Sequence, residues 1–301
     1  MSNKLVSVCL ITYNHEKFIR NAIEGVLMQK VDFEWELIIA DDFSTDGTRA
    51  IINEYKQKHP DFIKLILQEK NVGPAKNHID LITTPKSKYI ALCDGDDYWT
   101  DPLKLQKQIS FLETNPAYVI HSGNAVQISV DPEMNNKPMH NNTTDITFEL
   151  KDFLPTNNIL ACTTVFRNVE FELPANFDKI IFGDWFLYVI LLKKSGGKVY
   201  KSANLFSAYR VHSEGVMGSM DLLKYYESHV IQILAIHKYL NLKLELRVKN
   251  VLNYYFLQQY RIVLKKKMYT RSLKLFITNF KYSKTEIPLK KYLSEIKHHI
   301  L

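Results

Sequence analysis

The sequence predicts an α/β fold with a doubly wound, mostly parallel sheet and a helical C-terminal extension. Short apolar runs alternate with helix-length amphipathic segments through the first half of the chain, a pattern typical of βαβ units. The second half ends in long helical patterns rich in Tyr, Leu and Lys. With 46% hydrophobic residues and only ten Gly and ten Pro, the composition is that of a globular protein with a sizeable core.

The individual elements follow from the period of the apolar residues. Runs bounded by polar residues predict strands at Val6–Ile11, Glu36–Ala40, Ile63–Leu67, Tyr89–Cys93, Tyr118–Ser122, Lys198–Tyr200 and Leu205–Val211. Helical spacing of apolar residues predicts helices around Ile19–Leu27, Ile51–Tyr55, Leu105–Leu112 and Phe182–Lys194. The stretch Asp131–Thr147 is rich in Asn, Pro and Thr, and we expect it to form a loop.

Cysteine usage and the N-terminus bear on the compartment. The three cysteines, Cys9, Cys93 and Cys162, form no C-x-x-C pair, which argues against a disulfide framework or a zinc site and for a reducing compartment. The chain starts almost directly with a predicted core strand, and no apolar stretch reaches the roughly 18–20 residues of a transmembrane helix. We therefore expect a cytoplasmic protein.

The charge is divided unevenly along the chain. Residues 221–301 carry 16 basic and 5 acidic residues, a net charge of +11, whereas residues 1–220 sum to −4. Lys265–Lys267 stand among Leu264, Met268, Leu273 and Phe276. This pattern fits either a solvated packing element or a helix on an anionic membrane surface. Nucleic-acid binding explains the charge less well, because no recognised motif accompanies it.

Two acidic clusters follow predicted strands. Asp41 and Asp42 end the mostly apolar run that starts at Trp35. At this position they are suited either to accept hydrogen bonds from a nucleobase and a ribose hydroxyl, or to form a solvated turn before a helix. Asp94-Gly-Asp96-Asp97 follows the strand at 89–93, and such crowded carboxylates repel unless a cation or a solvated turn relieves them. Oxygen ligands of this kind suit Mg²⁺ or Mn²⁺, usually together with substrate phosphates. Both clusters fall at carboxyl ends of strands, where α/β sheets bind ligands.

Four sequence blocks follow one another along the chain: Val6-Ser-Val-Cys-Leu-Ile-Thr-Tyr-Asn14, Asp41-Asp-Phe-Ser-Thr-Asp46, Asn71-Val-Gly73 and Asp94-Gly-Asp-Asp-Tyr-Trp99. Together they resemble family-2 glycosyltransferases of the GT-A fold. Their order and spacing match the family, and the resemblance covers about residues 5–215. It implies a bacterial enzyme of the cell-surface polysaccharide type, with a nucleotide-binding sheet.

The resemblance also implies roles for the matching residues. Tyr13 would stack on the donor's base, and Asp42, with Asp41 beside it, would bond the edge of the base. Asn71, Gly73 and Lys76 would lie near the nucleotide, although the Lys76-Asn77 pair follows at a shorter spacing than in the family. Asp94 and Asp96 would contact the sugar nucleotide, and Asp96, Asp97 and His212 of Tyr209-Arg-Val-His212 would hold the metal. Asp184 matches the catalytic base; read alone, it is equally a helix-start carboxylate.

These features predict an enzyme that transfers a hexosyl or N-acetylhexosaminyl group from a nucleotide-diphosphate sugar to an acceptor hydroxyl, with inversion at the anomeric carbon. We expect the donor to be a UDP-sugar. The acceptor is expected to be a glycan or lipid-linked glycan, and the enzyme to lie in the cytoplasm or peripherally on the inner face of the membrane. We expect a glycosyltransferase domain at 1–217, with donor half 1–125 and acceptor half 126–217, and a basic helical region at 218–301. The alternatives are a sugar nucleotidyltransferase and an inactive carbohydrate-binding module.

Overall fold

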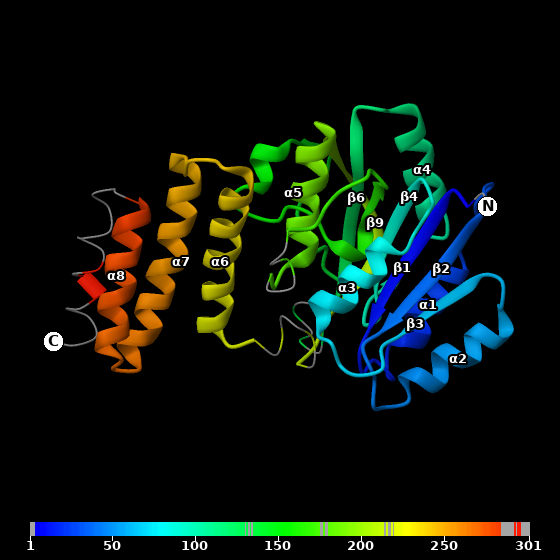
Figure 1. The fold of residues 1–301 in the computed structure, drawn as a ribbon, viewed down its shortest axis with the longest axis horizontal. Coiled ribbons are helices and arrows are strands. Elements are labelled where there is room, and N and C mark those ends of the chain that lie inside the picture. The colour runs from blue at the N-terminus through cyan, green and yellow to red at the C-terminus, as the bar shows by residue number, and fades with distance from the viewer. Residues whose placement is uncertain are drawn as a thin grey trace. The chain divides into compact units, whose positions relative to one another are not determined.

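The computed structural model describes residues 4–129, 131, 133, 135–174, 177, 180–213, 215, 218, 220–283, 292 and 294–295. Contacts divide the chain into two compact units (Figure 1). The first contains Met1–Leu150 and Asn158–Gly215, and the second contains Lys151–Asn157 and Val216–Leu301. The boundary predicted at Met217 lies outside the described residues.

The first unit is built on one mixed nine-stranded sheet of order β3-β2-β1-β4-β8-β6-β9-β5, with β7 pairing β9. The strands are β1 Val6–Thr12, β2 Trp35–Asp41, β3 Ile63–Leu67, β4 Tyr89–Asp94, β5 Tyr98–Trp99, β6 Tyr118–Ser129, β7 Ile146–Phe148, β8 Val165–Arg167 and β9 Lys198–Val211. Strands β1 to β4 are mutually parallel. The predicted α/β fold with parallel N-terminal strands is confirmed.

Helices flank both faces of the parallel strands. They are α1 Ile19–Leu27, α2 Thr48–Lys58, α3 Pro74–Thr83, α4 Lys104–Thr114 and α5 Gly183–Ser195, with short 3₁₀ turns at Leu150–Phe153 and Ala161–Thr163. Side chains of α1, α2 and α4 join alternate residues of β1 and β2 in one buried cluster. On the other face the Cys9 thiol contacts the Leu81 carbonyl of α3. Such alternation is what a parallel strand buried on both sides requires.

The described part of the second unit includes the helices α6 Leu222–Leu240, α7 Leu246–Lys265 and α8 Tyr269–Ser283. Asp221 caps α6 by accepting hydrogen bonds from the backbone N–H groups of Leu223 and Lys224. Asn241 ends the same helix in the left-handed conformation, a common helix stop. Among the described residues, no helix combines the length and the apolar character that crossing a membrane requires.

A lysine lies in the core of the first unit. Lys104 is fully buried, with its Nζ 4.0 Å from the centre of the Trp99 ring. Within the described part of the chain, Nζ has no hydrogen-bond partner. Burial lowers the pKa of Lys104 to about 7, whereas an unfolded lysine has a pKa of about 10.4. Folding is therefore opposed below about pH 10 by the need to release a proton or bury a charge.

We expect Lys104→Met to raise the free energy of unfolding at pH 7 by roughly 3 kcal/mol. Between about pH 7 and pH 10 the unfolded chain binds a proton that the folded chain has released, so the stability of the native protein rises with pH. The variant lacks this slope. Urea denaturation at pH 7 and pH 9 measures it, with Lys107→Met, a change at an exposed site on the same helix, as the control. If the free energy of unfolding of the wild type and of both variants changed equally with pH, the lowered pKa of Lys104 would be contradicted.

Candidate functional site

The parallel register brings the predicted site residues to one edge of the sheet. Thr12 pairs with Asp41, and Ile11 pairs with Asp94, so the chain segments that follow β1, β2 and β4 emerge together. The backbone confirms this closeness, since Asp42 N–H donates to the Thr12 carbonyl at 3.1 Å. The carboxyl ends of adjacent parallel strands form the usual ligand site of such a sheet.

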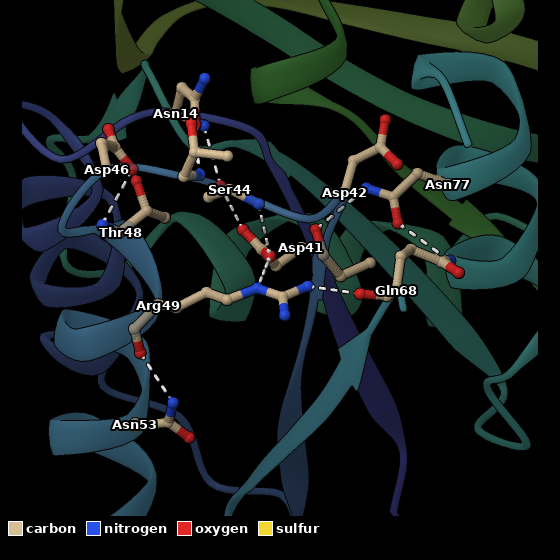
Figure 2. Close-up of polar contacts among 12 residues, drawn as sticks. Asn14, Asp41, Asp42, Ser44, Asp46, Thr48, Arg49, Asn53, Gln68 and Asn77 are labelled. Carbon is tan, nitrogen blue, oxygen red and sulfur yellow. Dashed lines mark hydrogen bonds and ion pairs between the residues drawn. The ribbon is translucent and has the colours of Figure 1, made fainter. Parts of the chain in front are cut away.

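The Asp41 carboxylate is bound by neighbouring side chains and backbone groups of the protein itself. Its side chain is fully buried and forms an ion pair with Arg49 Nε at 2.5 Å. It also accepts hydrogen bonds from the Ser44 hydroxyl and from the Ser44 backbone N–H, the latter at 3.0 Å. Arg49 in turn donates to the Gln68 carbonyl at 2.6 Å. Figure 2 shows Asp41 held between Ser44 and Arg49, an arrangement that shapes the loop after β2.

Asp42, the neighbouring carboxylate, joins β2 to the Asn71-Val-Gly73 block. Its Oδ1 accepts a hydrogen bond from Val72 N–H at 2.7 Å, and Gly73 N–H also interacts with it. Burial raises the pKa of Asp42 despite these bonds. Asn71 Oδ1 accepts from Gly73 N–H at 3.2 Å. Gly73 has φ +86°, which only glycine adopts readily, and this turns the chain into α3.

Tyr13 and Lys76 occupy different settings at this edge. The Tyr13 side chain is 42% exposed and follows β1 directly, so a ring face is available to a ligand. Lys76 forms an ion pair with Asp80 one turn along α3, which engages its ammonium group on the helix surface. The next residue, Asn77, is buried and donates to the Ala40 carbonyl at 3.1 Å, and thereby supports β2.

The acidic cluster after β4 contains three carboxylates with different environments. Asp97 is 2% exposed, and its pKa is raised well above the usual range by burial and by the charges of Asp96 and Asp94. Burial raises the pKa of Asp94 to about 8, and Asp96 and Asp184 add to the rise. Asp96 turns toward two imidazoles, with His212 Nε2 at 3.2 Å and His15 Nε2 at 3.8 Å from its Oδ2.

Gly95 permits this crowding. A β-carbon at Gly95 would lie 2.7 Å from His15 Nδ1 and 2.8 Å from Thr12 Oγ1, which are closer than atoms can approach. The glycine thus lets the turn between Asp94 and Asp96 pack directly on the end of β1.

Arg210, near the end of β9, forms hydrogen bonds that hold this turn in place. The sequence pattern did not indicate this role. Its backbone N–H donates to Asp97 Oδ1 at 2.8 Å, and its Nη1 donates to the Asp96 carbonyl at 2.6 Å. The guanidinium lies 4.5 Å from the Tyr98 ring centre and 5.2 Å from that of Phe18. Arg210 therefore fixes both the inward position of Asp97 and the backbone of Asp96.

Asp184 lies in the first turn of α5. Its charge contributes to the raised pKa values of Asp94 and of the buried Tyr188, so Asp184 stands within electrostatic reach of the acidic cluster. The fold thus brings the start of α5 within electrostatic reach of the carboxylates that follow β4.

The residues around Asp96 suit a divalent cation. In the described ranges no group of three or more Asp, Glu, His or Cys side chains forms a complete metal site. Asp96 and His212 form a pair of donors, however, and Mg²⁺ is commonly held by one or two protein ligands together with substrate phosphates and water. The pair therefore fits a metal that a diphosphate helps to bind.

Solved structures share this fold. Staphylococcus aureus TarS residues 1–349 in complex with UDP-GlcNAc aligns with a TM-score of 0.57 and 19% identity, over 98% of this chain and 80% of that one. A mannosyltransferase from Pyrobaculum calidifontis in complex with GDP-Man and Mn²⁺ aligns with a TM-score of 0.56 and 14% identity, over 99% and 75%. At these identities the likeness establishes the fold.

Curated relatives are similar at higher identity. An uncharacterized protein of Mycobacterium tuberculosis is 34% identical over 231 residues, which are 74% of this chain and 64% of the relative. The chain thus spans just under two thirds of the length of that protein. An Escherichia coli UDP-Glc:α-D-GlcNAc-diphosphoundecaprenol β-1,3-glucosyltransferase, WfaP, is 29% identical over 77% of this chain and 88% of its own length.

The family profile agrees with the four blocks. The profile of glycosyl transferase family 2 matches residues 7–173, more than half of the 301 residues. The matched range contains the three strand ends that carry Tyr13, Asp42 and Asp96. The resemblance seen in the sequence is confirmed, and the chain belongs to glycosyl transferase family 2.

Proposed function

We propose that this protein transfers a sugar from a nucleoside-diphosphate donor to an acceptor hydroxyl, with inversion at the anomeric carbon and with a divalent metal. The observation that carries the proposal is the convergence of Asp184 on the acidic cluster that holds the Asp96–His212 pair. A proton acceptor and a diphosphate-metal site within reach of each other are what a single-displacement glycosyl transfer needs.

The donor half of this proposal rests on the segments that follow β1, β2 and β3. Tyr13 offers an exposed ring to the base, while Asp42 and the Asn71–Gly73 turn are tied together beside it. We assign the donor a uracil base and a hexosyl or N-acetylhexosaminyl group. Support comes from WfaP, whose name specifies UDP-Glc, and from TarS, which was solved with UDP-GlcNAc.

The metal would be Mn²⁺ or Mg²⁺, held by Asp96 and His212. Its chemistry there is to stabilise the negative charge that develops on the leaving diphosphate. Asp97 is turned inward to the Arg210 backbone, so we assign it to shaping the turn that presents Asp96. Asp94, which ends β4, would contact the sugar nucleotide beside the metal.

Asp184 would accept the proton of the attacking hydroxyl. A base on the face opposite the leaving group gives one displacement, and no second nucleophilic carboxylate is needed. The hydroxyl would belong to a glycan or a lipid-linked glycan, as in polysaccharide or glycolipid synthesis. This assignment is supported by WfaP, whose named acceptor is a sugar-diphosphoundecaprenol.

Such an acceptor would place the enzyme at the inner face of the cell membrane, and α8 offers a suitable surface. Four apolar side chains on α8, each more than half exposed, recur at helical spacing: Tyr269, Leu273, Ile277 and Phe280. Lys274 and Lys281 lie on the same helix, and Lys265–Lys267 precede it. By contrast, Leu264 is 3% exposed and Phe276 packs on its cluster. The apolar face that would enter lipid is thus the 269–280 stripe.

We expect Leu273→Ser with Ile277→Ser to weaken sedimentation of the protein with phosphatidylglycerol vesicles by at least about tenfold, because two apolar side chains are lost from the lipid contact. Replacing Lys265–Lys267 by alanine would weaken it mainly at low salt. The control is Ile231→Ser, which removes an equally exposed side chain from α6. Equal sedimentation of all variants would contradict the membrane assignment.

A donor-hydrolysis assay tests the proposed reaction itself. The protein is incubated with a panel of nucleotide sugars, with Mn²⁺, with Mg²⁺ or with EDTA, and release of the nucleoside diphosphate is measured. Metal-dependent release from a UDP-sugar supports the proposal. Release of pyrophosphate from a sugar phosphate and a nucleoside triphosphate would identify a nucleotidyltransferase, and donor binding without turnover an inactive carbohydrate-binding module.

A further inference from the structure

We propose that Phe43 is a nucleobase-binding residue that forms, with Tyr13, the aromatic wall of the donor site. This inference rests on the proposed function, because it concerns the base of the nucleoside diphosphate that the enzyme would use. Phe43 directly follows Asp42 at the carboxyl end of β2, and its side chain is 40% exposed. A large exposed aromatic ring at this edge contributes little to the core and is open to a ligand.

The backbone at Phe43 is strained. Its φ is +61°, in the left-handed region that costs free energy for any residue with a β-carbon and is rare for bulky ones. Glycine or asparagine would adopt this conformation more easily. A strained aromatic residue that gains little burial indicates that its position serves binding rather than folding, since such outliers cluster at ligand sites.

Hydrogen bonds join the loop that carries Phe43 to the loop that carries Tyr13. The backbone N–H of Asn14 donates to Ser44 Oγ at 2.9 Å, and Thr45 N–H donates to Asn14 Oδ1 at 2.8 Å. The two loops are therefore joined at the residues that directly follow Tyr13 and Phe43 in the sequence. Both rings start from the edge where the Asp42 carboxylate lies, so a planar base that bonds Asp42 would have aromatic surface within reach.

Arg49 supports the ring of Phe43. Its guanidinium carbon lies 5.0 Å from the ring centre, within the range of a cation–π contact. The same guanidinium is fixed by Asp41 and by the Gln68 carbonyl, so the contact is made by an immobilised cation (Figure 2). The ring thus has a supported position before any ligand arrives, which lowers the ordering cost of binding.

Phe43→Gly separates binding from folding. Glycine accepts φ +61° without strain, so we expect the melting temperature to stay close to that of the wild-type protein. Affinity for UDP with Mn²⁺, measured by calorimetry, is expected to fall roughly 5- to 100-fold, the usual range for one base-stacking side chain. Binding of Mn²⁺-pyrophosphate, which has no base, is expected to be unchanged. Phe43→Tyr keeps a ring and is expected to restore UDP affinity.

Two further proteins make the test decisive. Phe43→Asn tolerates the same backbone conformation and serves as a second variant if the glycine variant folds poorly. Leu67→Ala removes a side chain that is also 40% exposed, at the end of β3, and is expected to bind UDP normally. Wild-type affinity for UDP in a folded Phe43→Gly or Phe43→Asn variant would overturn the inference. A wild-type protein that binds no nucleoside diphosphate would overturn the proposed function instead.

Discussion

Replacing Asp184 by asparagine is expected to lower sugar transfer by roughly 10²–10⁴-fold, the usual contribution of a positioned general base. Asparagine preserves the size of the side chain and its ability to accept a hydrogen bond at the start of α5, but it cannot take a proton. The loss is expected in kcat, with the KM for the donor preserved, because the interaction is made in the transition state. Steady-state transfer assays with varied donor and added Mn²⁺ measure both constants.

The helix itself provides the control for this variant. If Asp184 only stabilised the first turn of α5, asparagine would serve nearly as well, and turnover would survive. Near-normal kcat in a folded Asp184→Asn protein would therefore rule out Asp184 as the base, and would leave the donor-site assignments unaffected. Unchanged donor hydrolysis by water combined with lost transfer would separate acceptor activation from donor activation.

Replacing Asp96 by alanine is expected to reduce Mn²⁺-dependent donor binding by about 100-fold or more. Loss of an outer-shell partner of a metal typically costs roughly 10–100-fold in affinity, and loss of a direct ligand costs at least as much. The prediction follows from the 3.2 Å approach of His212 Nε2 to Asp96 Oδ2. Calorimetric titration of UDP with and without Mn²⁺ measures the metal-dependent part of the affinity.

Asp97→Asn is the matched control, because Asp97 Oδ1 accepts the Arg210 N–H and an amide oxygen does so as well. This variant is expected to retain metal-dependent binding within a few-fold. If Asp96→Ala kept full metal dependence while Asp97→Asn lost it, the assignments of the two carboxylates would have to be exchanged.

The parallel strands could be predicted closely from the sequence. Val6–Ile11, Glu36–Ala40 and Tyr89–Cys93 are almost entirely apolar runs, and each structural strand extends them by no more than two residues. Continuous burial on both faces leaves little freedom in such runs. The sequence also placed Asp41 and Asp94 at the same edge of the sheet, and they lie there, because the direction of parallel strands fixes where their ends meet.

Other elements gave weaker signals. Helix α3 was not predicted, since Asn77 and His78 interrupt its apolar face and its partners lie on β1 and β2. The strands β5 and β8 have two and three residues, which is too short for a period to show. Strand β9 was expected as two strands because the polar residues Ser202 and Asn204 interrupt its apolar pattern. Pairing with β6 nevertheless keeps it continuous through register shifts. The predicted loop at 131–147 also contains the start of β7.

The contacts that set the roles of the carboxylates were out of reach of any local pattern. Asp96 and Asp97 are chemically alike and adjacent, and only the turn at Gly95 and the distant Arg210 decide which one faces His212. In the same way, the ion pair with Arg49 distinguishes Asp41 from Asp42. When two adjacent residues have the same side chain, tertiary contacts determine how each side chain is oriented and what it binds.

The distance along the chain between Asp96 and His212, 116 residues, has a consequence for how the protein becomes active. Contacts of such long sequence separation close late in folding, and β9, which leads to His212, must first pair with β6. A growing chain would therefore possess Tyr13, Asp42 and the strand ends long before it possesses both residues that we propose as metal ligands. Affinity for the proposed metal would appear only once β9 is in place, and it would report that the sheet of the first unit is complete, independently of the helices α6–α8 in the second unit.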